Sequence, residues 1–113
     1  DCSSILGGLS NKNSGSFSSI VGGSNNCICQ ISGYSIIGGG ANNCMSGSSS
    51  VIAGGRNNQY RGNCSFVGGG YFNRNYDCQS VINGGFSNYI FTTGDGRNTI
   101  GGGYRNTIVG DHG

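Results

Sequence analysis

The hydrophobic positions of this chain recur in one short pattern. An isoleucine or valine is followed, after one variable residue, by two glycines, two variable residues and an asparagine. The unit occurs seven times, and consecutive asparagines are 15, 17, 15, 15, 15 and 18 residues apart. The apolar residues are Ile5, Ile20, Ile37, Ile52, Val67, Ile82 and Ile100, and the asparagines are Asn11, Asn26, Asn43, Asn58, Asn73, Asn88 and Asn106. Such regularity is typical of a stacked repeat fold and not of a disordered Gly/Ser chain.

A period near 15 residues is long enough for two short strands and two turns. A serine precedes the isoleucine or valine by two residues in six of the seven units. Because alternate residues of a strand point to one side, we expect the serine, the isoleucine or valine and the second glycine to face inward. The glycine pair permits a tight corner, where the asparagine is expected either to hydrogen-bond the backbone or to adopt the left-handed conformation itself. The sequence therefore predicts an all-β, parallel β-solenoid or β-roll of about seven coils, as a single domain over residues 1–113, with the asparagines stacked in a ladder.

The residue before each repeated isoleucine or valine is expected to point outward, yet four of these seven residues are apolar. A strand that is apolar on both faces is normally covered on both. The next outward position is mostly occupied by small residues, which would let another chain approach closely. We therefore expect a homo-oligomer, with a trimer preferred over a monomeric solenoid, and its inter-chain face to consist of Ile36, Val51, Phe66 and Val81.

Composition argues against several functional classes. The net charge is only +2 and the basic residues are scattered, so no nucleic-acid partner is expected. No apolar run is long enough to insert into a membrane. The chain has four aspartates, no glutamate and no acidic residue that recurs with the repeat. Paired catalytic carboxylates and a calcium-binding roll are therefore not expected, and we predict neither enzymatic activity nor a cofactor.

The Ser-x-Ile-x-Gly-Gly-x-x-Asn units resemble the β-roll repeats of trimeric autotransporter adhesin heads and the Gly-Gly-Gly-x-x-Asn repeats of phage and large-virus fibre proteins. The resemblance covers Ser3 to Ile108. It implies a left-handed, trimeric rod at a cell or virion surface that projects or forms a host- or surface-binding region. The longer period and the six cysteines depart from adhesin heads and favour the viral or phage side. Because neither end shows a capping unit, we also expect a segment of a longer fibre protein.

The six cysteines include no Cys-x-x-Cys pair, and His112 is the only histidine, so no zinc site is expected. Cys27 and Cys44 each follow the repeat asparagine directly, in successive units. Stacked coils would bring them within bridging range, and we predict a disulfide between them. The alternative is that all six are small residues tolerated at coil positions.

The two long steps suggest insertions at residues 27–32 and 89–98 that bulge outward as loops. The second insertion contains Tyr89, Phe91, Asp95 and Arg97, which are groups suited to stacking on sugars and bonding their hydroxyls. A surface glycan or receptor is thus a candidate partner of this loop, and simple loop tolerance is the alternative.

Ice binding is the rival function, because regular rows of small polar residues on a flat solenoid can order water. The threonines Thr92, Thr93, Thr99 and Thr107 do not recur with the repeat, however, and the regular serines are expected to face inward. The sequence therefore favours the structural fibre over the ice-binding protein.

Overall fold

The computed structural model describes residues 2–29, 32–92 and 96–110. These residues form fourteen short strands in two parallel sheets, and none of them forms a helix that could cross a membrane. The odd-numbered sheet contains β1 (Ser4–Ile5), β3 (Ser19–Ile20), β5 (Ile36–Ile37), β7 (Val51–Ile52), β9 (Phe66–Val67), β11 (Val81–Ile82) and β13 (Thr99–Ile100). The even-numbered sheet contains β2 (Lys12–Asn13), β4 (Cys27–Ile28), β6 (Cys44–Met45), β8 (Gln59–Tyr60), β10 (Arg74–Asn75), β12 (Tyr89–Thr92) and β14 (Thr107–Gly110).

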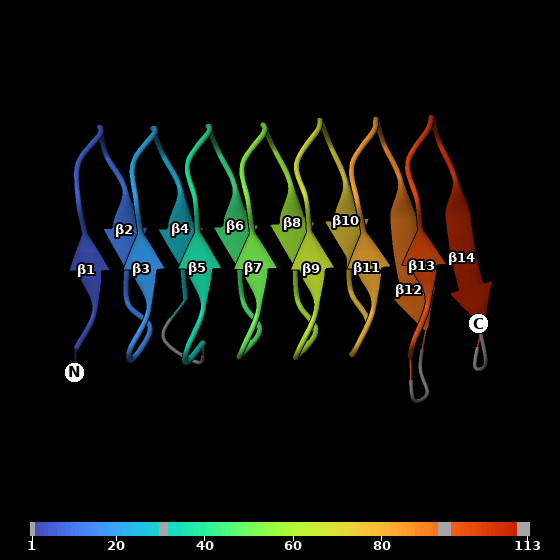
Figure 1. The fold of residues 1–113 in the computed structure, drawn as a ribbon, viewed down its shortest axis with the longest axis horizontal. Coiled ribbons are helices and arrows are strands. Elements are labelled where there is room, and N and C mark those ends of the chain that lie inside the picture. The colour runs from blue at the N-terminus through green and yellow to red at the C-terminus, as the bar shows by residue number, and fades with distance from the viewer. Residues whose placement is uncertain (1, 30–31, 93–95, 111–113) are drawn as a thin grey trace.

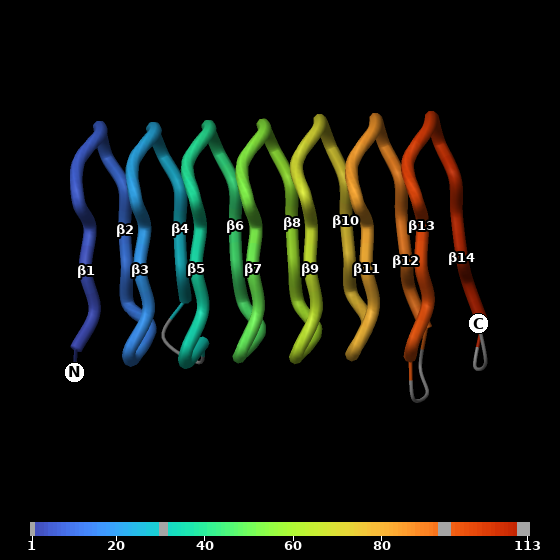
Figure 2. Tube along the Cα trace, in the orientation of Figure 1, coloured from blue at the N-terminus to red at the C-terminus, as the bar shows by residue number. Residues whose placement is uncertain are grey.

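Each repeat makes one coil, with one strand in each sheet (Figure 1). Seven coils stand side by side along the long axis, and the chain ends lie at opposite ends of the stack (Figure 2). The extents of the stack are 37 × 25 × 14 Å. Backbone amides of one coil donate to carbonyls of the next, as from Gly38 to Ile52 at 2.9 Å. The predicted β-solenoid with a period of about 15 residues is confirmed.

The repeated isoleucine and valine side chains fill the interior. Ile20, Ile37, Ile52, Val67 and Ile82 have no exposed surface, and each pairs in register with its neighbours in the odd-numbered sheet. Opposite them, the even-numbered sheet contributes a second buried column made of Ile28, Met45, Tyr60, Asn75 and Ile90. Ile5 belongs to the same column as Ile20 but is 43% exposed, since in the first coil a neighbour covers only one of its sides.

Glycine makes the first corner of each coil possible. The second glycine of each pair has a positive φ, between 85° and 99°, which a side chain would disfavour. This glycine is exposed at the corner, so the expectation that it faces inward is wrong. The first glycines, such as Gly54, are less exposed than the second, but a Cβ at Gly54 would meet nothing within 4 Å.

The asparagines form a buried ladder just after this corner. The side-chain amide of Asn58 donates to Gly54 O at 3.0 Å and to Gly70 O of the next coil at 3.2 Å. Its Oδ1 accepts the backbone N–H of Asn73 at 3.0 Å. The same pattern runs along the stack and satisfies backbone groups that a corner would otherwise leave without partners. The asparagine therefore bonds the backbone, and the left-handed conformation belongs to the residue before it, such as Asn57 with a φ of 57°.

The serines form a second buried ladder at the opposite corner. Ser50 donates its hydroxyl proton to Ser48 O at 2.8 Å and accepts the backbone N–H of Ser65 at 3.3 Å. Ser35 donates to Gly33 O in the same way, and Ser35 and Ser80 each accept the backbone N–H of the next ladder residue. The residue before each of these serines is left-handed, as in Ser49 and Cys64. Two polar ladders thus flank the apolar columns and fix the coil at both corners.

Candidate functional site

The outward face of the odd-numbered sheet carries a column of apolar side chains. Ile36, Val51, Phe66 and Val81 pair in register and point away from the interior. Ile36 is 45% exposed and the other three are partly buried by their neighbours. Gly38, Ala53 and Gly68 follow at the next outward position. We call the four apolar residues the apolar stripe.

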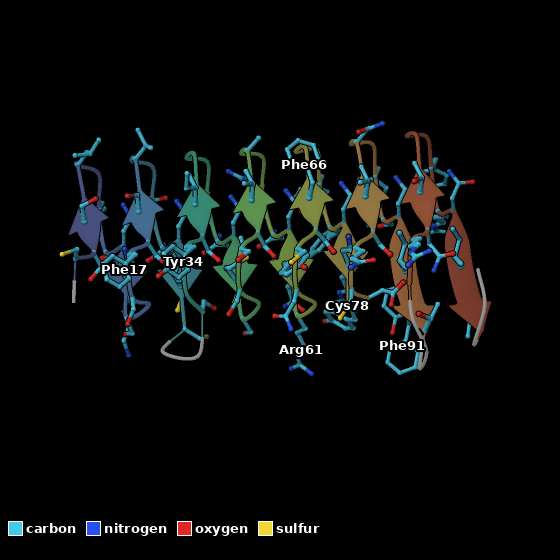
Figure 3. All side chains as sticks on the ribbon, turned by 60° about the horizontal axis from the view of Figure 1, so that its bottom comes forward. Phe17, Tyr34, Arg61, Phe66, Cys78 and Phe91 are labelled. Carbon is cyan, nitrogen blue, oxygen red and sulfur yellow. The ribbon has the colours of Figure 1, made fainter. Side chains whose placement is uncertain are left out.

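The outward face of the even-numbered sheet differs along its length. Cysteines occupy its N-terminal half, whereas aromatic and basic side chains occupy its C-terminal half. The guanidinium of Arg61 lies 5.2 Å from the ring centroid of Tyr76, and the ring of Tyr76 meets that of Tyr89 edge-on at 5.6 Å. Arg61 and Phe91 project from the side of the coil opposite Phe66 (Figure 3). This face therefore stays open if the apolar stripe is covered.

An aromatic column runs along the first corner of the last coils. Tyr71, Phe86 and Tyr104 pair in register, and their rings stack with centroids 5.2 and 5.3 Å apart. Phe72 meets Tyr71 edge-on at 4.3 Å, and the guanidinium of Arg105 lies 5.0 Å from the Tyr104 ring. The 15-residue spacing of Tyr71 and Phe86 could have revealed the start of this column in the sequence.

An open groove of about 330 Å³ lies beside the aromatic column. It is lined by Phe72, Arg74, Ser87 and Tyr89, which combine two rings, a cation and a hydroxyl. Aromatic faces and neighbouring hydrogen-bonding groups are suited to flat polar ligands such as sugars. The groove is thus a concave surface that combines aromatic and polar groups.

The predicted binding loop is only partly a loop. Tyr89 and Phe91 lie in β12, where their rings stack at 6.2 Å. The Nε–H of Arg97 donates a hydrogen bond to Gln79 Oε1 at 3.3 Å. Asp95 lies outside the described residues. The predicted insertion boundaries are likewise wrong, because Cys27–Ile28 and Tyr89–Thr92 are strands paired with neighbouring coils.

The structure does not contain the predicted disulfide between Cys27 and Cys44. The two residues are paired in register, but both are free thiols. The Cα–Cβ bonds of such a pair run parallel, so the Cβ atoms are separated by the strand spacing of about 4.8 Å. A disulfide requires a Cβ separation of about 3.8 Å. Stacking in register therefore brings the thiols close without bringing them to bonding geometry.

Cys29 joins these two residues in a cluster that the sequence analysis missed. The sulfur atoms of Cys27, Cys29 and Cys44 all lie within 4.8 Å of one another. Burial raises the pKa of the Cys27 thiol and, with the neighbouring thiols, raises that of Cys44 to about 11. The signal was available in the spacing of Cys27 and Cys29, because residues two apart on a strand point to the same side.

Asp77 is the only acidic residue among the described positions, and it is buried. Its Oδ2 accepts hydrogen bonds from the Ser80 hydroxyl at 2.7 Å and the Asn98 amide at 2.9 Å. Its Oδ1 accepts the backbone N–H of Cys78 at 2.9 Å. Burial by itself raises the pKa of this carboxyl, but the surrounding donors outweigh it and lower the pKa below the ordinary value of 3.8. The carboxylate thus links Ser80 to Asn98, which occupies the serine position of the last coil.

We expect Asp77 to make the fold sensitive to acid. The pKa of Asp77 is lower in the folded than in the unfolded state. Its contribution to the free energy of unfolding is therefore complete above the ordinary pKa of 3.8 and is lost as the pH falls through the folded-state pKa. The free energy of unfolding should therefore fall below about pH 4. Urea unfolding between pH 2 and pH 7 measures this, and the acid limb should be flatter in Asp77→Asn. Parallel acid limbs in the two proteins would contradict the assignment.

The described threonines do not form a row. Thr99 pairs with Val81, Thr107 pairs with Tyr89, and Thr92 pairs with Gly110. The serines that do recur are buried at 6% exposure or less from Ser18 to Ser80. No regular column of exposed hydroxyl groups is therefore present among the described residues.

No protein-family model matches the chain, and no curated protein matches its sequence.

Proposed function

We propose that this protein is a structural module of a fibre or adhesin at a cell or virion surface, where it forms a stiff homotrimeric rod. The observation that carries the proposal is the unbroken register of both sheets from β1 to β13 and from β2 to β14. Almost every coil is held by the same apolar column and the same two polar ladders. Repetition of the same contacts from coil to coil suits a mechanical role, in which the module projects or presents a surface.

The apolar stripe supports assembly of identical chains. Its four side chains lie in one column on the four adjacent strands β5, β7, β9 and β11, where the apolar surface can meet a copy of itself. The glycines and alanine at the next outward position leave the backbone open to close approach. The stripe gives the four coils that carry it the same contact, so the energy of association grows with the number of such coils.

The groove between Phe72, Arg74 and Tyr89 supports a separate contact surface. Arg74 and Tyr89 lie in β10 and β12 of the even-numbered sheet, which an assembly through the apolar stripe leaves open. Two rings beside a guanidinium suit a glycan, and we place the surface-binding region of the fibre here.

We expect the wild-type protein to sediment as a trimer of the 11.5 kDa chain. Replacing Ile36, Val51, Phe66 and Val81 together by serine should give a monomer, because the apolar area that drives association is lost. Serine is tolerated in this column, since Ser4 and Ser19 already occupy it. Analytical ultracentrifugation at several protein concentrations measures the change.

The matched control carries four serines on the opposite face, in place of Gln59, Arg61, Arg74 and Tyr76, and should remain trimeric. Glycan-array binding by the wild-type trimer that is lost in Tyr89→Ser would support the groove as the contact surface. A monomeric wild-type protein would overturn the proposed assembly. A monomer with clear thermal hysteresis would favour ice binding instead.

A further inference from the structure

We propose that Cys27, Cys29 and Cys44 form a binding site for one Cu(I) ion. The site lies on the outward face of the even-numbered sheet and is independent of the apolar stripe and of the aromatic groove. It is built by the fold and not by local sequence, because the third ligand comes from the next coil.

The backbone holds the three thiols on one face of the even-numbered sheet. Cys27 and Cys44 are register partners on β4 and β6. Ile28 has no exposed surface, so Cys27 and Cys29 on either side of it both point outward. The backbone N–H of Cys29 donates to Met45 O at 2.9 Å, which holds its end of the strand against the next coil. All three side chains are partly buried.

The sulfur spacing suits a metal better than a disulfide. A metal–sulfur bond of about 2.3 Å in a trigonal arrangement sets the sulfur atoms about 4 Å apart. The observed separations of up to 4.8 Å need only small side-chain rotations to reach this value. Cys27 and Cys29, two residues apart on a strand, have Cβ atoms separated by about 6.6 Å, which is too far for a disulfide. The spacing of the three sulfur atoms therefore fits one cation bound by all of them.

The donor set selects the type of cation. Three thiolates are soft ligands that favour Cu(I) or Zn²⁺ over Mg²⁺ or Ca²⁺. Zn²⁺ prefers four ligands in a tetrahedron. Among the described residues only three thiols meet, and the fourth corner of the cluster is Ser46, whose hydroxyl donates to Cys29 Sγ at 3.4 Å. Cu(I) is satisfied by three sulfur ligands, so it is the cation that fits.

The surroundings support a negatively charged thiolate complex. Cu(I) with three thiolates has a net charge of −2, and Lys12 pairs with Cys27 in the adjoining coil. The charge of Lys12 lowers the pKa of Cys27, although burial outweighs it and the pKa remains raised. On binding, each sulfur lone pair bonds to copper and each thiol proton passes to the buffer.

Titration of the reduced 113-residue chain with Cu(I), in competition with a chromogenic Cu(I) chelator under anaerobic conditions, tests the site. Cys44→Ser and Cys29→Ser should each lower the Cu(I) affinity by about 100-fold or more. Serine fits both positions, because Ser46 already occupies the column of Cys29 and both side chains point outward. The matched control is Cys64→Ser, which removes an exposed thiol outside the cluster and should bind as the wild type does.

Two further readouts distinguish the site from adventitious thiol binding. X-ray absorption at the copper edge should show three sulfur neighbours in the wild type and in Cys64→Ser. The affinity should rise with pH, by up to about tenfold per pH unit for each thiol proton released. Equal affinities in Cys44→Ser and Cys64→Ser would overturn the proposal. Tighter binding of Zn²⁺ than of Cu(I) would also overturn it. So would a disulfide between two cysteines of the cluster that resists the reducing agent used in the titration.

Discussion

Gly55→Ala is expected to destabilise the solenoid by about 3 kcal/mol or more. Gly55 has a φ of 85°, and a Cβ there would lie 2.3 Å from Gly70 O and 2.7 Å from Asn58 Nδ2. Both neighbours belong to hydrogen-bonded ladders, so neither can move without breaking bonds in the next coil. Urea unfolding followed by circular dichroism, at one fixed protein concentration, measures the loss.

The adjacent glycine provides the control. A Cβ on Gly54 would meet nothing within 4 Å, and Gly54 does not have a positive φ. Gly54→Ala should therefore change the free energy of unfolding by no more than about 0.5 kcal/mol. The two variants differ only in the position of one methyl group along the corner. Similar losses in both would show that the corner does not require the left-handed glycine.

Asn58→Ser is expected to lower the free energy of unfolding by about 3 kcal/mol or more. The shorter side chain cannot reach both Gly54 O and Gly70 O, which lie 3.0 and 3.2 Å from the asparagine amide. The substitution also removes Oδ1 of residue 58, which accepts the backbone N–H of Asn73 at 3.0 Å. Asn58 has no exposed surface, so water cannot easily replace these bonds. The same urea titration measures this change.

Asn57→Ser is the matched control for this prediction. Asn57 precedes the ladder residue and is left-handed, and Ser10 and Ser87 are left-handed at the same position of other coils. Its backbone N–H donates to Ala41 O at 3.0 Å, a bond that serine preserves. The loss should stay below about 1 kcal/mol. If Asn57→Ser proved as costly as Asn58→Ser, the stability would not reside in the buried ladder.

These predictions show what makes the repeat strict at some positions and loose at others. Glycine and asparagine recur because a backbone clash or an unbonded carbonyl would disrupt two coils at once. The outward columns tolerate serine, cysteine, arginine and tyrosine, since their side chains project from the sheet. The variable positions, on the outward columns and at the first corner, therefore carry the side chains that differ from coil to coil.

The period of the sequence by itself determined which residues stack. Once each block of about 15 residues is one coil, Ile37, Ile52 and Val67 must fall in one column, and so must Asn43, Asn58 and Asn73. The same arithmetic placed Cys27 beside Cys44 and set the apolar stripe on the outside. Periodicity is sufficient here because a parallel stack in register repeats the contacts of one coil in the next.

Only the tertiary structure decided how each coil turns and what lies side by side at its surface. The sequence left open whether the asparagine or its neighbour is left-handed, because both choices put an asparagine at a corner. The disulfide prediction failed because stacking sets the distance between Cys27 and Cys44 but also makes their Cβ bonds parallel. The partners of Asp77 and Cys29, Asn98 and Cys44, lie in the next coil and meet them through side-chain directions that the period does not give. Repetition fixes what lies above and below a residue, whereas directions and corner dihedrals depend on the folded backbone.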